Sequence, residues 1–440
     1  MLQISENNRY IVKDDGSPFF YLGDTAWCLF HRLNREEAGI YLENRAAKGF
    51  TVVQAVVLSE HGGLRVPNAL GEREFIDGDM RRPNERYFEH VDYIVDLAAS
   101  LGLHVGMLPS WGDKVGVNYW GEGPAHFVNE ENSEYWGGYL GERYGSKPVI
   151  WILGGDRPFD CNEEIWRKMA KGIKSSETEP HLMTYHPMGG YSSSHWLQPE
   201  EWLDFNMMQT GHGAFVDTWR KVGSDYSRLP TKPVMDGEPC YEDHPDGFNQ
   251  NSVYLNDYHV RVAAYWAMLA GAHGHTYGCH AMWQFWDPAK TLPINWPKLP
   301  WTESLHLPGA SQMSHMRRFF ESRPFLSRIP DQSLITDGQR FGLGHVQAGR
   351  DGTKGKSDAS YIMVYFSKAH EVEIRTGCIA GDGIRGWWFN PRTGEAEETR
   401  VLEKRETQAF STPDDNMGRD WVLVLDDSSM GYGPPGVATP

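Results

Sequence analysis

Hydrophobic and polar positions alternate regularly between residues 19 and 325. Short apolar runs, rich in β-branched and aromatic residues, predict buried strands, and each is followed by a longer amphipathic segment. This strand-then-helix pair occurs eight times. The expected strands are 19–27, 51–60, 103–112, 148–156, 181–189, 205–213, 232–242 and 272–286. The expected helices are 34–50, 84–102, 132–145, 162–176, 199–204, 214–228, 252–271 and 311–323.

The number and length of these pairs indicate a closed barrel. Eight strand–helix pairs within about 300 residues are typical of the (β/α)8 or TIM barrel, and continuous apolar strands fit a parallel sheet buried on both faces. An open doubly wound sheet would alternate similarly, but the eight repeats and the lack of a Gly-rich phosphate loop favour closure. We therefore predict an α/β fold with a (β/α)8 barrel over residues 1–326. Its N-terminal part is expected to form a hairpin that turns at Asp14-Asp15-Gly16.

The pattern changes after Pro330. Runs such as SYIMVYF and DWVLVLDD are short and alternating, are separated by Gly, Asp and Asn turns, and show no helical period. These features are typical of an antiparallel β-sandwich. We expect a small C-terminal β-sandwich domain over residues 327–440, packed on the barrel.

Charge and composition narrow the class of partner. The formal net charge of −17 disfavours nucleic acid and anionic membrane surfaces. No apolar run is long enough to cross a membrane, and the N-terminus MLQISENNRYIV shows no signal peptide. We therefore expect a cytoplasmic protein, or a secreted or periplasmic one if a leader was removed. Aromatic residues make up 13% of the chain, including 17 Trp, which suits sugar stacking and a large aromatic core equally.

The cysteines and histidines do not form a metal-binding pattern. Five cysteines stand at irregular spacing without a CxxC motif, so neither a disulfide framework nor a structural zinc site is expected. Histidines occur near the predicted strand ends, but none has HxxxH or 2-His-1-carboxylate spacing on a helix. We expect no metal and no cofactor. A metal-dependent hydrolase remains an alternative, which loss of activity in EDTA would reveal.

Polar and aromatic side chains stand where each predicted strand ends. In TIM barrels the C-terminal ends of the strands form the rim of the active site. Any one of these residues could be a helix cap or a core residue, but a purely structural barrel has no reason to place them at all eight ends. We therefore predict a pocket in which tryptophans stack on sugar faces and polar groups bind hydroxyls. The candidate substrate-binding residues are Asp24, Trp27, His61, Trp111, His186, Gln209, His212, Trp283 and Trp286, with Trp120 as a further stacking candidate.

Two of the strand ends carry a pair of carboxylates. Asp156 ends the fourth strand, after WILGG, and Glu238 ends the seventh, in MDGEPCYE. These two strand ends face each other across the mouth of a barrel. Retaining glycosidases place two carboxyl groups about 5–5.5 Å apart, one as acid/base and one as nucleophile. Asp156 and Glu238 are therefore the candidate catalytic residues.

Each carboxylate also has a structural interpretation. Asp156 could be a turn residue or the cap of the next helix, although Asp160 and Asn162 lie closer to that helix. Glu238 could be a salt-bridged rim residue. Its main rival is Asp236, which strand alternation is expected to place on the same inward face, one layer deeper.

Five segments spread over nearly the whole chain resemble one enzyme family. They are FFYLGDTAW, RAAKGFTVVQAVV, WILGGDRP, MDGEPCYE and, near the end, GWWFNPRTGE. Together they resemble the apiosidase-like proteins of glycoside hydrolase family 140, within the clan A barrels. One departure from the wider clan is Gly-Asp at the end of the fourth strand, where Asn-Glu is usual; this matches the apiosidase-like pattern.

The resemblance implies an activity and a role for each carboxylate. It implies a retaining glycoside hydrolase with Asp156 as acid/base and Glu238 as nucleophile. The implied substrate is a plant cell-wall oligosaccharide or polysaccharide, with apiose or another terminal pentofuranose as the candidate sugar. A non-catalytic carbohydrate-binding barrel is the alternative; it would keep the tryptophans and lose one carboxylate, whereas both are present. Oligomeric state is left open by the sequence.

Overall fold

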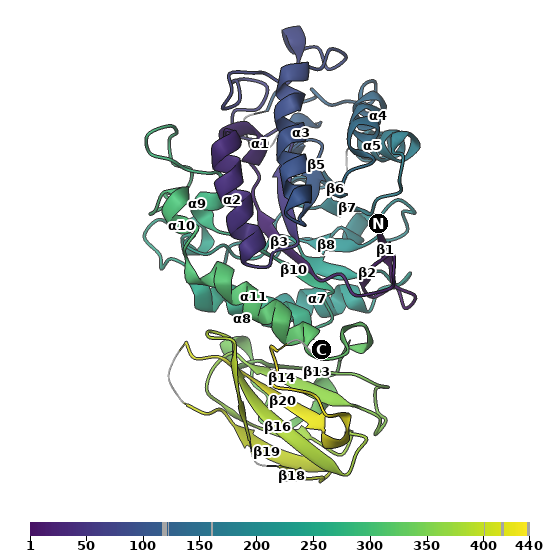
Figure 1. Ribbon diagram of the computed structural model, residues 1–440, viewed down its shortest axis with the longest axis vertical. Helices are drawn as coiled ribbons and strands as arrows, with labels where there is room; N and C mark the ends of the chain where they lie inside the picture. Colours follow the sequence, from purple (N-terminus) through teal and green to yellow (C-terminus); the bar gives the residue numbers. More distant parts are fainter. Residues whose placement is uncertain (117–120, 122, 160–161, 400, 415–417, 438–440) are drawn as a thin grey trace.

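The structure is a computed structural model that describes residues 1–116, 121, 123–159, 162–399, 401–414 and 418–437 and contains an eight-stranded parallel barrel (Figure 1). The strands pair in the order β7-β6-β5-β4-β3-β10-β9-β8, and β7 meets β8 where the Thr184 hydroxyl donates to the Phe205 carbonyl (2.6 Å). The predicted TIM barrel is therefore confirmed. Its strands are β3 (Tyr21–Thr25), β4 (Val52–Val56), β5 (His104–Leu108), β6 (Val149–Gly154), β7 (Met183–His186), β8 (Asn206–Met208), β9 (Val234–Asp236) and β10 (Gly274–Tyr277).

Helices surround the barrel. Helix α2 begins with a capping box, in which the Asn34 side chain accepts from the Glu37 N–H and the Glu37 carboxylate accepts from the Asn34 N–H. No helix within the described ranges is long and apolar enough to cross a membrane. The helices are α1 (Leu29–Arg32), α2 (Arg35–Ala47), α3 (Glu85–Ser100), α4 (Ser133–Tyr144), α5 (Glu163–Ser176), α6 (Ser194–Leu197), α7 (Thr218–Tyr226), α8 (Asp257–Leu269), α9 (His280–Trp283), α10 (Trp301–Ser304) and α11 (Pro308–Glu321).

Two segments have a different structure from the one predicted, and each predicted barrel strand is longer than the strand observed. The helix predicted at 199–204, as the fifth of the barrel, is wrong. The short helix in this part of the chain is α6, which ends at Leu197. Asp204 exchanges two bonds with the backbone of Met183, at 2.7 and 2.8 Å, so this segment is held beside β7 as it enters β8. The predicted last strand at 272–286 is too long, because β10 ends at Tyr277 and α9 follows. Short apolar runs do not by themselves distinguish strand from helix.

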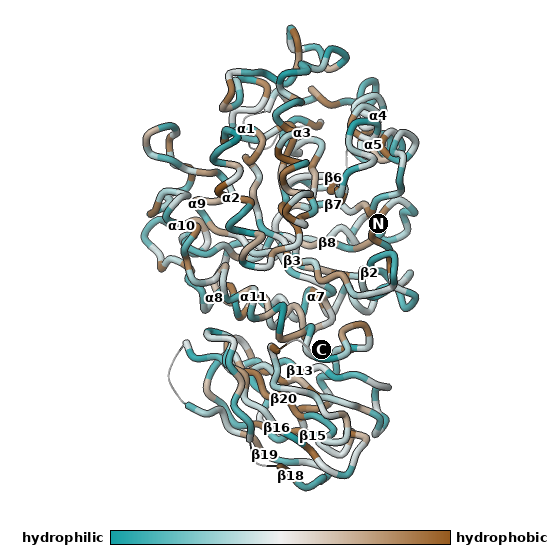
Figure 2. The backbone as a smooth tube through the Cα atoms, in the orientation of Figure 1, coloured by the Kyte–Doolittle hydropathy of each residue, from teal (hydrophilic) through white to brown (hydrophobic). Residues whose placement is uncertain are grey.

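Strand alternation divides the barrel residues between two cores. On β4, Val52 and Val56 face the barrel interior, whereas Val53 and Ala55 pack against the helices. The other strands alternate in the same way, as a parallel sheet buried on both faces requires. Figure 2 shows hydrophobic residues concentrated inside the molecule and hydrophilic residues along the outer loops.

The N-terminal hairpin packs against the barrel interior. β1 (Leu2–Ile4) pairs antiparallel with β2 (Ile11–Lys13), and Ile11 and Phe19 join the core that fills the barrel. The loop between β1 and β2 spans residues 5–10, so this hairpin does not turn at the predicted place. The predicted turn at Asp14-Asp15-Gly16 is present after β2, where it brings Pro18 beside Val12: Gly16 has φ +77°, and its N–H donates to the Lys13 carbonyl (2.9 Å).

The C-terminal region is an antiparallel sandwich, as the alternating runs predict. Its larger sheet has the order β11-β13-β14-β20-β16-β17, with β18 added to β16, and its smaller sheet has the order β12-β15-β19. The strands are β11 (Ile329–Pro330), β12 (Ile335–Asp337), β13 (Val346–Arg350), β14 (Tyr361–Phe366), β15 (Glu371–Arg375), β16 (Gly383–Asn390), β17 (Glu395–Glu398), β18 (Leu402–Glu403), β19 (Thr407–Ser411) and β20 (Trp421–Asp427).

The sandwich lies against α7, α8 and α11 of the barrel domain (Figure 1). One continuous apolar core spans the contact, where Tyr265 of α8 stacks on Tyr365 of β14 with ring centroids 4.9 Å apart. Beside this stack, the fully buried Asp420 accepts from Arg261 of α8 (2.9 Å) and from the Tyr365 hydroxyl (3.0 Å). The two parts of the chain therefore share a buried interface with a charged pair at its centre.

Asn in place of Asp420 is expected to destabilise the protein by about 3 kcal/mol, because it removes one of the two carboxylates that pair with the buried Arg261 guanidinium; the other is Asp257. The measurement is the midpoint of chemical unfolding. The control is Glu398→Gln, which breaks the solvent-exposed pair with Arg385 and should leave the midpoint unchanged. Equal midpoints for Asp420→Asn and the wild type would contradict this role.

Candidate active site

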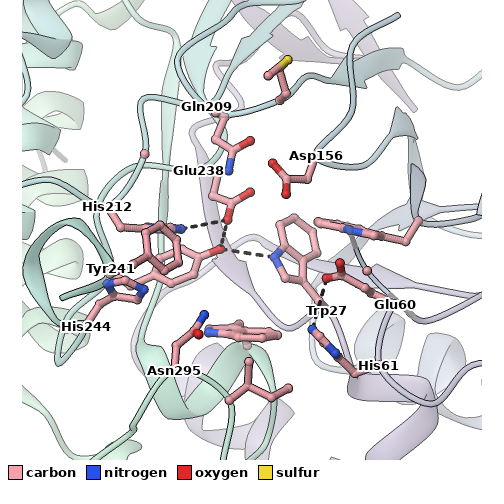
Figure 3. Close-up of a pocket in the computed structure, with 18 residues that line it drawn as sticks. Trp27, Glu60, His61, Asp156, Gln209, His212, Glu238, Tyr241, His244 and Asn295 are labelled. Carbon is pink, nitrogen blue, oxygen red and sulfur yellow. Dashed lines mark hydrogen bonds and ion pairs between the residues drawn. The ribbon is translucent and has the colours of Figure 1, made fainter. Parts of the chain in front are cut away.

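A cavity of about 570 Å³ opens at the C-terminal ends of the barrel strands (Figure 3). All its described lining residues belong to the barrel domain. Eight of the predicted site residues line it together: Trp27, His61, Trp111, Asp156, Gln209, His212, Trp283 and Glu238. Trp120 lies outside the described residues.

The backbone beside Asp156 explains the two glycines that precede it. Gly154, Gly155 and Asp156 have φ values of +89°, +123° and +55°, a conformation that favours glycine. A Cβ on Gly155 would lie 2.9 Å from the indole ring of Trp111. The glycines therefore let the neighbouring loop and its tryptophan approach the backbone while Asp156 turns into the cavity.

Asp156 is held by its neighbour rather than by the following helix. The cap of α5 is Asn162, six residues later, so Asp156 is not a helix cap. Arg157 Nη1 donates to the Asp156 carbonyl (2.7 Å) and lies 3.6 Å from Oδ2. The Asp156 carboxyl group, 27% exposed, points into the cavity on the side facing Glu238 (Figure 3).

Glu238 follows β9 and is surrounded by donors. The Tyr241 hydroxyl donates to Oε1 (2.5 Å), and Trp27 Nε1–H donates to the Tyr241 oxygen (3.2 Å). His212 Nε2 lies 3.3 Å from Oε1, and His186 Nε2 lies 2.8 Å from Oε2. Oε1 is thereby held by the Tyr241 hydroxyl, Oε2 has an imidazole nitrogen beside it, and the side chain is only 6% exposed.

The electrostatics of the site keep Glu238 ionised. Burial raises the pKa of the Glu238 carboxyl, but His186 and His212 lower it by more, so that its pKa lies well below the ordinary value. Burial and the adjacent Glu238 charge raise the pKa of Tyr241 well above its ordinary value, so its hydroxyl remains a donor. A buried anion that accepts hydrogen bonds and faces a second carboxyl group can serve as a nucleophile beside an acid.

His186 connects the two carboxylate residues from below. It is fully buried and is not among the residues that line the cavity. Its Nδ1 accepts from the Asp156 N–H at 3.5 Å, while its Nε2 faces Glu238. The structure thus places this predicted substrate ligand beneath the site, against Glu238.

Two other predicted ligands lie outside the cavity. Asp24 points outward from β3 and accepts from Arg45 Nε (2.6 Å) and from the Tyr41 hydroxyl (2.5 Å), both on α2. Trp286 follows α9, is partly exposed and does not line the cavity. For Asp24 the reason is strand parity, because the inward positions of β3 are those of Tyr21 and Gly23.

The side chain of Asp236 does not point inward as predicted, and strand parity is again the reason. Met235 faces the barrel interior, so Asp236 points outward, where the Thr210 hydroxyl donates to it (2.6 Å). The expectation that it lies one layer beneath Glu238 is wrong. Burial is the main cause that raises the pKa of Asp236, to about 7, against partial lowering by Thr210.

This raised pKa predicts a pH dependence of stability. The folded protein holds the Asp236 proton up to about pH 7 and the unfolded chain only to about pH 4, so this group removes stability as pH rises between those values. Asp236→Asn lacks this loss. Its unfolding free energy relative to the wild type should increase from pH 4 to 7, by at most about 4 kcal/mol. Parallel stability profiles from urea unfolding would contradict the burial of a protonated Asp236.

Sequence reasoning did not single out several lining residues. Glu60 lines the cavity, and its position at the end of the predicted strand 51–60 could have identified it. Its Oε2 lies 3.2 Å from His61 Nε2. Tyr241, three residues after Glu238, carried no signal of its own. His244 and Asn295 lie in loops whose approach to the cavity depends on the fold.

Among the described residues, the histidines of the segment HGHTYGCH do not form a metal site. Burial lowers the pKa of His273 and of His275 to about 3, so both are neutral at ordinary pH. His280 Nε2 donates to the Asn295 carbonyl (2.7 Å). Within the part of the chain that the structure describes, no three His, Cys, Asp or Glu side chains come together as metal ligands.

Comparisons with known proteins agree with this geometry. Residues 5–327 match the family model described as "Apiosidase-like, catalytic domain", and residues 329–426 match "Putative collagen-binding domain of a collagenase". Among solved structures, a glycoside hydrolase is 33% identical over 98% of both chains, with a TM-score of 0.90. A family 5 glycoside hydrolase from Bacteroides vulgatus is 32% identical over 100% of this chain and 95% of its own, also with a TM-score of 0.90.

No curated protein matches the chain. The family match covers the whole barrel, including the cavity and both carboxylate residues. The chain is therefore a glycoside hydrolase and belongs to the apiosidase-like family.

Proposed function

We propose that the protein is a retaining glycoside hydrolase in which Glu238 is the nucleophile and Asp156 the acid/base. In the first step, ionised Glu238 attacks the anomeric carbon while protonated Asp156 gives its proton to the leaving glycosidic oxygen. A covalent glycosyl–enzyme forms and the leaving alcohol departs. In the second step, the Asp156 carboxylate takes a proton from water, whose oxygen displaces Glu238 from the sugar.

The observation that carries this proposal is the environment of Glu238. Its Oε1 accepts from Tyr241, and two imidazoles hold the anion, so the group is ionised and oriented before substrate arrives. Preorganised donors of this kind lower the barrier because they need no rearrangement during the reaction. Asp156 faces the same space from the opposite side, as acid/base chemistry on the glycosidic oxygen requires (Figure 3).

The lining of the cavity supports a neutral sugar as the group transferred to Glu238. Among the described lining residues, Glu60, Asp156 and Glu238 are carboxylates, and none is Lys or Arg. The amide oxygen of Gln209 is buried without a hydrogen-bond partner among the described residues, so it offers a further acceptor. All of these acceptors suit sugar hydroxyls, and the carboxylates repel a uronate. Together with the family match, this supports release of terminal apiose or another neutral pentofuranose from a plant cell-wall glycan.

The test is a screen of plant cell-wall polysaccharides and oligosaccharides, with chromatography of the released sugar and ¹H NMR of the first-formed anomer. We expect release of a neutral sugar with the anomeric configuration of the substrate. A product of inverted configuration would contradict the two-step mechanism. Release of a uronic acid would contradict the neutral-sugar assignment and leave the mechanism intact.

A further inference from the structure

We propose that Gln54 is a positioning residue for the nucleophile. The inference rests on the proposed function, because it concerns how Glu238 is held. Gln54 lies at the centre of β4 and is fully buried, between the inward-facing Val52 and Val56. An amide in such surroundings is costly unless its hydrogen bonds are satisfied, so its partners indicate its role.

The amide of Gln54 crosses the barrel to the peptide group that precedes the nucleophile. Its Nε2–H donates to the carbonyl oxygen of Gly237 at 3.1 Å, and its Oε1 accepts from the Tyr21 hydroxyl at 3.4 Å. The Gly237 N–H donates to the Met208 carbonyl at 2.8 Å. Both backbone groups of Gly237 are thus held, the N–H by β8 and the carbonyl by Gln54.

This contact acts on the nucleophile through covalent geometry. The Gly237 carbonyl and the Glu238 N–H belong to one planar peptide unit, so turning that unit swings the Glu238 side chain. The Glu238 carbonyl accepts from the Gly211 N–H at 3.3 Å, which holds the backbone on the other side. Gln54 therefore fixes the peptide plane from the barrel interior, while Tyr241 and His212 contact the carboxylate from the rim.

Space for the crossing side chain comes from a glycine on the next strand. Gly106 of β5 is the register partner of Gln54. A Cβ on Gly106 would lie 3.2 Å from Gln54 Cγ and 2.9 Å from Ile152 Cδ1. A side chain at position 106 would therefore crowd both Ile152 and Gln54 without removing the Gln54 amide.

The main variant is Gln54→Met, which keeps the approximate length of the side chain and removes the N–H donor. On the substrate found by the screen, we expect kcat to fall about 10- to 100-fold and KM to stay within about twofold, because the nucleophile moves while the sugar contacts remain. The matched control is Tyr21→Phe. It removes the buried hydroxyl that donates to Gln54 Oε1 and leaves the hydrogen bond from Gln54 Nε2 to the Gly237 carbonyl. Its kcat should stay within about threefold of the wild type.

Gly106→Ala is the second variant and carries the test if Gln54→Met does not fold. It should also lower kcat with little change in KM. Glu238→Gln is measured in the same assay. If Glu238→Gln is inactive while the Gln54 and Gly106 variants keep the wild-type kcat, the positioning role is overturned and the proposed function stands. An equal loss of kcat in Tyr21→Phe would also overturn it, and an active Glu238→Gln would overturn the proposed function itself.

Discussion

Replacing Glu238 with alanine is expected to lower kcat/KM by about 10⁴-fold, equivalent to about 5 kcal/mol of transition-state stabilisation. The variant lacks the group that attacks the anomeric carbon, so the covalent route is lost. The donors around the site, Tyr241 and His212, remain but have no anion to orient. The measurement is steady-state kinetics on the substrate identified by the screen.

Sodium azide should restore part of this turnover. The small anion fits the space left by the Glu238 carboxylate and attacks the anomeric carbon in a single displacement. The product, a glycosyl azide, should therefore have the anomeric configuration opposite to that of the substrate, which ¹H NMR resolves. Activity of Glu238→Ala within tenfold of the wild type, or an azide product of retained configuration, would contradict the nucleophile assignment.

Asp236→Asn is the matched control for this experiment. It removes a buried carboxylate only two residues away, but one that faces outward and bonds to Thr210. We expect it to keep wild-type kcat. The comparison therefore separates loss of the Glu238 carboxylate from general damage at the end of β9.

Replacing Asp156 with alanine is expected to lower activity selectively. On substrates with an alcohol leaving group, the loss should be about 10³-fold, because the glycosidic oxygen departs without a proton. On aryl glycosides whose phenol leaves without protonation, the first step should be nearly unaffected. Since the second step still lacks its base, the glycosyl–enzyme should accumulate, and mass spectrometry of the intact protein would detect it.

Azide distinguishes this variant from the Glu238 variant. In Asp156→Ala the azide ion attacks the glycosyl–enzyme and needs no general base, so turnover of the aryl glycoside should rise. Two displacements at the anomeric carbon give a glycosyl azide with the configuration of the substrate. An equal loss of activity on alcohol and phenol leaving groups would show that Asp156 is not the acid/base.

The fold was largely predictable because its signal is repeated. Eight apolar runs with amphipathic segments between them specify a barrel even when one helix is misplaced, as at 199–204, since the count tolerates a local error. The pair Asp156 and Glu238 was predictable for a related reason. Strand counting brings distant positions to the same rim without any knowledge of side-chain contacts.

The direction of individual side chains was not predictable to the same degree. Asp24 and Asp236 lie at strand ends, yet both point outward, because a side chain changes face with each residue and strand bounds read from sequence are uncertain by more than that. Glu238 and Trp27 lie beyond the last residue of their strands, so strand alternation does not set their direction, and both line the cavity.

By itself the sequence determined the barrel, the sandwich and the two carboxylates, because these follow from local periodicity and from the order of elements along the chain. Only the tertiary structure decided which groups act on those carboxylates. His186 and Gln54 lie on other strands, and their contacts with Glu238 or its peptide join positions up to 183 residues apart. Such contacts depend on closure of the barrel, which brings distant strands face to face across one interior and leaves no trace in the local pattern of hydrophobic and polar residues.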